Sequence, residues 1–162
     1  MEEDNYQRLR DYSLKLLSFR PRSTNEISAK LREYCAKKKF PQNLSDKVID
    51  YLKKQKFIDD LEFARWWIDQ RHSFKPKGLL AIKLELLNKG IDKETISEAL
   101  KGDKEEKVSE YDLATKVINK KIILFKKLSR EKMIMKIRDL LLRHGFDWDT
   151  IHKVIDSYVQ KA

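Results

Sequence analysis

The sequence predicts an all-α protein made of three tandem three-helix repeats, with about nine helices forming an elongated, curved array. Turn-forming residues are scarce, because the 162 residues include only four glycines and three prolines, while 41% are hydrophobic. Apolar residues recur at three- and four-residue spacing along most of the chain, as on one face of a helix. The sequence also repeats itself with a period of about 50 residues, which is typical of stacked helical units.

The repeat is clearest between the second and third copies, at an offset of 55 residues. Residues 90–96 read Gly-Ile-Asp-x-x-Thr-Ile, and residues 145–151 read Gly-Phe-Asp-x-x-Thr-Ile. A more divergent first copy aligns at an offset of 51, with Arg20 on Arg71 and Phe40 on Ile91. We therefore divide the chain into three repeats, at residues 1–58, 59–102 and 103–162.

Each repeat is expected to form three helices with an apolar stripe facing its core. Such stripes include Ile27, Leu31, Tyr34 and Cys35 in the first copy, Leu79, Ile82, Leu86 and Leu87 in the second, and Ile151, Val154, Ile155 and Tyr158 in the third. The predicted helices are near residues 6–19, 24–38, 44–56, 60–73, 78–89, 93–101, 110–127, 130–143 and 148–160.

Residues that start and end helices lie between these segments. Residues 23–26 and 59–62 have the spacing of a capping box, and Asp92, Ser129 and Asp147 are suitable N-caps. Gly90 and Gly145 follow predicted helices, where a left-handed residue ends the last turn. The first copy has no glycine before Phe40, which predicts a longer or differently capped turn. The charged segment 102–107 is the expected loose joint between the second and third repeats.

The charge of the chain favours a polyanionic partner. The net charge is +10. The first predicted repeat carries 14 basic and 8 acidic side chains, the second carries 8 of each, and the third carries 14 basic and 10 acidic side chains. Nucleic acid is the first candidate, although a merely soluble basic surface would give the same total. Two basic end repeats could contact a phosphate backbone at separate points.

Catalysis, metal binding and export are not indicated by the sequence. The single Cys35 cannot form an internal disulfide, and with no signal peptide or apolar membrane span the chain is expected to be cytoplasmic. His72, His144 and His152 lack metal-ligand spacing, and no catalytic or phosphate-binding motif is present. We therefore expect a protein that binds rather than catalyses, with no cofactor and no metal. Of the two adjacent tryptophans, Trp67 is the better core candidate, which leaves Trp66 either packed on the adjoining repeat or available to anchor a partner.

The candidate binding residues are basic side chains, several of which lie at the turn before the middle helix of a repeat. Residues 20–22 and 75–77 are Arg-Pro-Arg and Lys-Pro-Lys at equivalent turns, and Lys116, Lys120 and Lys127 would share one face of a continuous helix. Basic residues at helix ends also complement the helix dipole without any ligand. The full set comprises Arg20, Arg22, Arg65, Arg71, Lys75, Lys77, Lys83, Lys116, Lys120, Lys121 and Lys127.

Three segments of the chain together resemble the RecX family of bacterial recombination regulators. They are Arg20-Pro-Arg-Ser-x-x-Glu-Ile followed by Lys30-Leu31, then Phe57-Ile-Asp-Asp-x-x-Phe-Ala, then Lys77-Gly-x-x-x-Ile-x-x-Glu-Leu-x-x-Lys-Gly-Ile. The resemblance covers nearly the whole chain in the right order. The chain departs from the family pattern at Lys39 and at Lys56-Phe57, where glycine and Gly-Tyr are usual, and the third repeat is the least similar.

The resemblance implies a non-enzymatic modulator of the RecA recombinase. Such a protein would lie along the groove of the RecA filament on single-stranded DNA, as a monomer, and mostly inhibit ATPase, strand-exchange and co-protease activities. The charge alone leaves open a free-standing DNA-binding helical module without preference for the filament.

Overall fold

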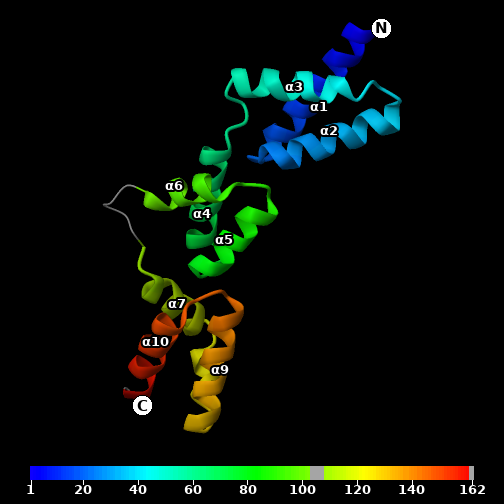
Figure 1. Ribbon diagram of the computed structural model, residues 1–162. Helices are drawn as coiled ribbons and strands as arrows, with labels where there is room; N and C mark the ends of the chain where they lie inside the picture. Colours follow the sequence, from blue (N-terminus) through cyan, green and yellow to red (C-terminus); the bar gives the residue numbers. More distant parts are fainter. Residues whose placement is uncertain (103–107, 161–162) are drawn as a thin grey trace. The chain divides into compact units, whose positions relative to one another are not determined.

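The computed structural model describes residues 1–102 and 108–160, and all regular structure in these residues is helical (Figure 1). The prediction of an all-α protein is confirmed. The ten helices are α1 (Glu2–Phe19), α2 (Thr24–Lys38), α3 (Asn43–Lys54), α4 (Asp60–Ser73), α5 (Leu79–Asn88), α6 (Lys93–Lys101), α7 (Glu110–Asn119), α8 (Ile122–Phe125), α9 (Arg130–Arg143) and α10 (Trp148–Gln160). The expected loose joint at residues 102–107 lies, apart from Gly102, outside the described residues.

The prediction of one continuous helix over residues 110–127 is wrong. Helix α7 ends at Asn119, a tight turn follows in which the Lys121 N–H donates to the Ile118 carbonyl at 2.8 Å, and the single turn α8 begins at Ile122. The break lets Phe125 pack into the core with Leu113. Lys116, Lys120 and Lys127 therefore do not share one continuous helical face.

The predicted helix starts are confirmed by hydrogen bonds. Ser23 and Glu26 form a complete capping box at the start of α2. Asp92 and Asp147 accept hydrogen bonds from the N–H groups of Thr95 and Thr150 at 2.7 and 2.8 Å. These bonds satisfy N–H groups that have no partner within their own helix.

The end of the middle helix is built in the same way in all three repeats. Gly90 and Gly145 have φ angles of +79° and +80°, and Lys39 adopts the same left-handed conformation at φ +57°. In each repeat the next residue donates its N–H to a carbonyl five residues earlier, at 2.8, 3.1 and 3.2 Å for Phe40, Ile91 and Phe146. The longer or differently capped turn predicted for the first repeat is therefore wrong, because Lys39 takes the place of glycine at the cost of some backbone strain.

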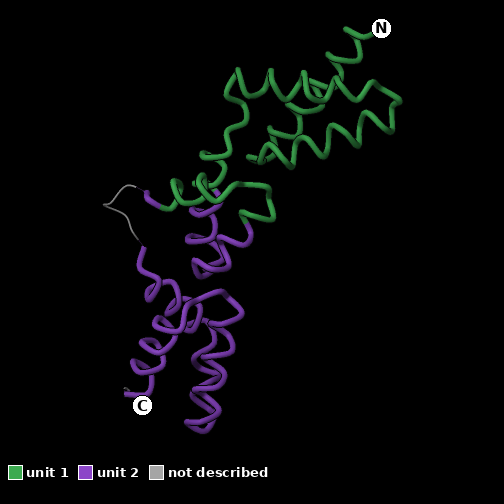
Figure 2. Tube along the Cα trace, in the orientation of Figure 1, with its two compact units in different colours: residues 1–66, 86–100 green, residues 67–85, 101–162 purple. Residues whose placement is uncertain are grey.

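The chain forms two compact units, and the boundary between them passes through α4 and α5 (Figure 2). Unit 1 comprises residues 1–66 and 86–100, and its core includes Leu9, Ile27, Leu31, Cys35 and Leu52. Unit 2 comprises residues 67–85 and 101–162, and its described core includes Leu113, Ile118, Phe125, Ile137, Leu141 and Ile151. The predicted stripes of the first and third repeats face these cores. In the stripe of the second repeat Ile82 and Leu86 are buried, whereas Leu87 is 41% exposed.

The middle helices of the three repeats are α2, α5 and α9. The start of α2 contacts the end of α5 in unit 1, and the start of α5 contacts the end of α9 in unit 2. In unit 1 the Ser23 hydroxyl donates to the Lys89 carbonyl at 2.7 Å, and the Thr24 N–H donates to the Asp60 carboxylate at 2.8 Å. In unit 2 the equivalent bonds are Gly78 N–H to the His144 carbonyl at 2.7 Å and Leu79 N–H to Glu110 at 3.2 Å. We call these two sets of contacts the helix-start joints.

Glycine is required at the helix-start joint of unit 2. A Cβ atom added to Gly78 would lie 2.2 Å from the Gly145 carbonyl oxygen, and one added to Gly145 would lie 2.3 Å from the Ala81 Cβ. Burial raises the pKa of the Glu110 carboxyl group, the Leu79 N–H lowers it, and the charge of Asp147 raises it further. The joint thus combines close backbone packing with a partly buried acid.

Candidate nucleic-acid interface

Glu26 collects two basic side chains at the start of α2. Its carboxylate accepts from the Arg20 guanidinium at 2.8 and 3.3 Å and from Lys89 Nζ at 2.7 Å. Burial acts to raise the pKa of Glu26, but the hydrogen bonds from Arg20, Lys89 and the Ser23 N–H outweigh it and lower the pKa to about 2. We call Glu26, Arg20 and Lys89 the Glu26 cluster.

Glu85 on α5 forms a second cluster of the same kind. It accepts from Trp67 Nε1 at 2.9 Å, from Arg71 Nε at 2.7 Å and from Lys77 Nζ. The Arg71 guanidinium also lies over the Trp67 ring, 4.7 Å from its centroid. Burial raises the pKa of Glu85, whereas these three hydrogen bonds lower it by a larger combined amount. We call Glu85, Trp67, Arg71 and Lys77 the Glu85 cluster.

Four of the eleven predicted binding residues are therefore held by the protein itself. Arg20, Arg71 and Lys77 belong to the two clusters, and Arg22 donates from Nε to the Leu16 carbonyl at 3.1 Å, which caps the last turn of α1. Their bonds fix the direction of each charge. None of the four is a free, flexible cation.

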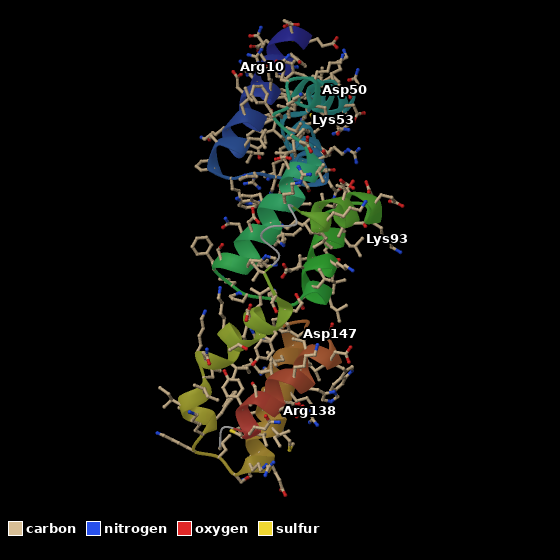
Figure 3. All side chains as sticks on the ribbon, turned by 90° about the vertical axis from the view of Figure 1, so that its left-hand side faces the viewer. Arg10, Asp50, Lys53, Lys93, Arg138 and Asp147 are labelled. Atoms are coloured by element: carbon tan, nitrogen blue, oxygen red, sulfur yellow. The ribbon has the colours of Figure 1, made fainter. Side chains whose placement is uncertain are left out.

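The other seven predicted residues are exposed, and Arg65 alone among them makes an ion pair with a described residue, Glu62 at 2.7 Å. The remaining six are Lys75, Lys83, Lys116, Lys120, Lys121 and Lys127. Exposed cations also occur outside this set, including Lys53 on α3 and Lys93 on α6 (Figure 3). The described residues thus offer a basic surface in both units.

Sequence reasoning missed the partners within these two clusters and two exposed phenylalanines beside them in sequence. Glu26 and Glu85 sit within the motifs, but their partners are distant, since Lys89 is 63 residues from Glu26. Phe19 and Phe74 were also missed, although each directly precedes a predicted basic turn; their exposed fractions are 72% and 70%. The signal that could have revealed them is the repeated four-residue pattern Phe-basic-Pro-basic at residues 19–22 and 74–77.

The two tryptophans differ from the expected arrangement. Trp67 is only half-buried and donates to Glu85, so it is not a fully buried core residue. Trp66 is also half-buried, with its ring 5.8 Å from that of Phe63. The buried residues of α4 near the tryptophans are Phe63, Ala64 and Ile68.

The described residues contain no group of three or more side chains suited to hold a metal ion. His144 Nδ1 lies 2.8 Å from the carbonyl of Leu140 in α9, and burial lowers the pKa of His72.

None of the helices in the described ranges is long and apolar enough to cross a membrane. Cys35 is fully buried, and burial raises the pKa of its thiol.

Comparison with protein families matches most of the chain to one family. Models of the first, second and third three-helix domains of RecX match residues 10–52, 59–100 and 109–155. The sequence-based division at residues 58 and 102 is compatible with these ranges but stays a proposal for the domain boundaries.

Individual relatives extend the match over nearly the full length. Regulatory protein RecX of Prosthecochloris aestuarii is 30% identical over 159 residues, covering 97% of each chain. That of Chlorobium limicola is 32% identical, covering 92% of this chain and 88% of the relative. Regulatory protein RecX of Oceanobacillus iheyensis is 32% identical over 96% of this chain, which spans 55% of that relative's length.

Solved structures have the same fold. The crystal structure of RecX from Lactobacillus salivarius matches with a TM-score of 0.73 and 25% identity over 96% of this chain and 97% of the other. A second crystal structure, of regulatory protein RecX, has a TM-score of 0.79 over 95% of this chain and 74% of the other, at 22% identity. The curated relatives are named regulatory proteins, which supports a regulatory role for this chain. The chain belongs to the RecX family.

Proposed function

We propose that this protein binds the RecA filament on single-stranded DNA and mostly inhibits its ATPase, strand-exchange and co-protease activities in recombination and repair. Membership of the RecX family is the observation that carries this proposal. It acts without catalysis, as a monomer in the cytoplasm. Tandem helical units suit a long, repetitive partner, because each unit can contact a successive part of it.

The basic surface supports the nucleic-acid half of the proposal. The net charge is +10, and six of the predicted cations make no ion pair with the described residues. Exposed cations of this kind can replace counterions on phosphates. The partner's protein subunits would be contacted by other parts of the surface.

The decisive experiment measures the single-stranded-DNA-dependent ATPase of RecA and its strand exchange with substoichiometric amounts of the protein. Both rates are expected to fall. Binding should also be tighter to RecA-coated DNA than to bare DNA at physiological salt. Unchanged rates and equal affinity for the two substrates would reject the proposal.

A free-standing DNA-binding module is the second candidate, and the charge alone favours it. It predicts similar affinity for bare and coated DNA and a steep loss of affinity with salt. The comparison of bare with RecA-coated DNA therefore separates the two functions.

A further inference from the structure

The turns before α2 and before α5 share an exposed aromatic ring followed by a rigid basic tripeptide. We call residues 19–22, Phe-Arg-Pro-Arg, corner 1, and residues 74–77, Phe-Lys-Pro-Lys, corner 2. Phe19 and Phe74 are 72% and 70% exposed, whereas Phe63 and Phe146 are buried. Since an exposed ring contributes nothing to the core, its recurrence 55 residues later at the same place in the repeat points to a partner.

Both corners carry positive charge in a fixed position. Arg20 is held by Glu26 at corner 1, and Arg71 and Lys77 are held by Glu85 at corner 2. Because two cations share the single Glu85 carboxylate, that carboxylate neutralises only one of their two charges. Arg22 adds a charge at corner 1 and the exposed Lys75 adds one at corner 2. Because the cations bonded within the protein are already ordered, binding an anion to them loses little further conformational entropy.

We propose that Phe19 and Phe74 each stack on an unpaired base of single-stranded DNA, while the cations of the same corner contact the adjoining phosphates. A flat ring beside a fixed cation matches the alternation of base and phosphate along a single strand. In a duplex the base faces are stacked on one another, so a ring could reach them only by unstacking a step. The choice of DNA as the strand rests on the proposed function.

The corresponding turn of the third repeat differs, which limits the proposal to two corners. Residues 120–129 separate α7 from α9, compared with residues 20–23 and 74–78 in the other repeats. The exposed apolar residues there are Ile123, Leu124 and Leu128, at 74%, 62% and 37%, and Phe125 is buried. Aliphatic side chains lack a flat face for a base, so we assign no stacking contact to this turn.

The test uses fluorescence anisotropy of the full chain with two labelled oligonucleotides of equal length, oligo-dT and an abasic strand with the same phosphates. Loss of an aromatic ring is expected to weaken binding on the order of 10-fold per base. The double variant F19L–F74L should therefore bind oligo-dT about 10-fold more weakly and bind the abasic strand as the wild type does. The variant F19Y–F74Y, which keeps both rings, should bind both strands normally.

F57L is the matched control, because Phe57 is also exposed, at 51%, but lies outside both corners and 6.3 Å from the ring of Tyr51. It should bind oligo-dT like the wild type. Unchanged binding of oligo-dT by F19L–F74L, equal losses on both strands, or a loss seen only with RecA-coated DNA would each overturn the proposal. The last result would instead assign the rings to a protein contact. The comparison of bare oligo-dT with the abasic strand contains no RecA, so its outcome is independent of the test of filament inhibition.

Discussion

At the scale of single residues, Glu26 decides how the start of α2 is held. Its pKa is lowered from 4.5 to about 2, so its charge stabilises the folded protein above pH 4.5, and this contribution is lost as the pH falls toward 2. Glu26→Gln should lower the free energy of unfolding at pH 7 by on the order of 2 kcal/mol. Thermal melting across pH 2 to 7 should show the gap to the wild type closing at the acid end.

The control for this prediction is Glu33→Gln. Glu33 pairs with Lys30 and Lys37 on the exposed side of α2, where ion pairs contribute little. A melting temperature for Glu26→Gln that matches this control at pH 7 would contradict a stabilising role of the Glu26 cluster.

Charge reversal should have different consequences at Arg20 and Lys75. Arg20→Glu places a second carboxylate against Glu26, so the melting temperature should fall together with DNA binding. Lys75 is exposed and makes no ion pair with a described residue, so Lys75→Glu should reduce DNA affinity and its salt dependence at an unchanged melting temperature. Filter binding and melting of both variants check this, and a large loss of stability in Lys75→Glu would be contrary to it.

At the scale of helices, the predicted core stripes can be tested by truncation. Leu86 and Ile151 are both 0% exposed, so Leu86→Ala and Ile151→Ala should each destabilise the protein by about 2 to 5 kcal/mol through the cavity they leave. Leu84, also on α5, is 59% exposed, so Leu84→Ala should change stability by less than about 0.5 kcal/mol. Urea unfolding measures all three, and similar values for Leu84 and Leu86 would refute the assigned orientation of α5.

The helix-start joint of unit 2 predicts a strong effect of one methyl group. In Gly78→Ala the new Cβ would collide with the Gly145 carbonyl, so the backbone must move. The hydrogen bonds from the Gly78 N–H to the His144 carbonyl and from the Leu80 N–H to the Gly145 carbonyl must then lengthen. We expect a clear drop in melting temperature and faster exchange of the Leu80 amide hydrogen. In Gly102→Ala the added Cβ meets nothing within 4 Å, and the φ of +45° costs the alanine about 1 kcal/mol. A drop for Gly78→Ala no larger than that for Gly102→Ala would argue against the joint.

Helix ends were predictable where the deciding residues are local. The ranges 24–38, 60–73, 93–101, 130–143 and 148–160 agree with α2, α4, α6, α9 and α10, because a cap or a glycine marks their limits. The break after Asn119 was not predictable, since it brings Phe125 into a core formed with distant helices. The same reason hid the clusters: Glu26 meets Lys89, and Trp67 meets Glu85, only after the chain has folded.

At the scale of the whole molecule, three similar domains make the family assignment firm. The order of the motifs was enough to indicate RecX, and the matches to all three domains confirm it. The residues that touch a partner were harder to choose, because net charge reports the number of cations and not their neighbours. Five of the eleven candidates, including Arg22 and Arg71, form hydrogen bonds within the protein.

The helix-start joints also bear on the order in which the chain matures as it leaves the ribosome. Helices α1 to α3 are complete by Lys54, yet the start of α2 also donates hydrogen bonds to Asp60 and to the Lys89 carbonyl, 36 and 66 residues beyond their donors. Synthesis at about 5 to 20 residues per second delays the Lys89 carbonyl by seconds. A nascent chain arrested before residue 89 should accordingly be easier for a protease to cut near Ser23 than the released protein.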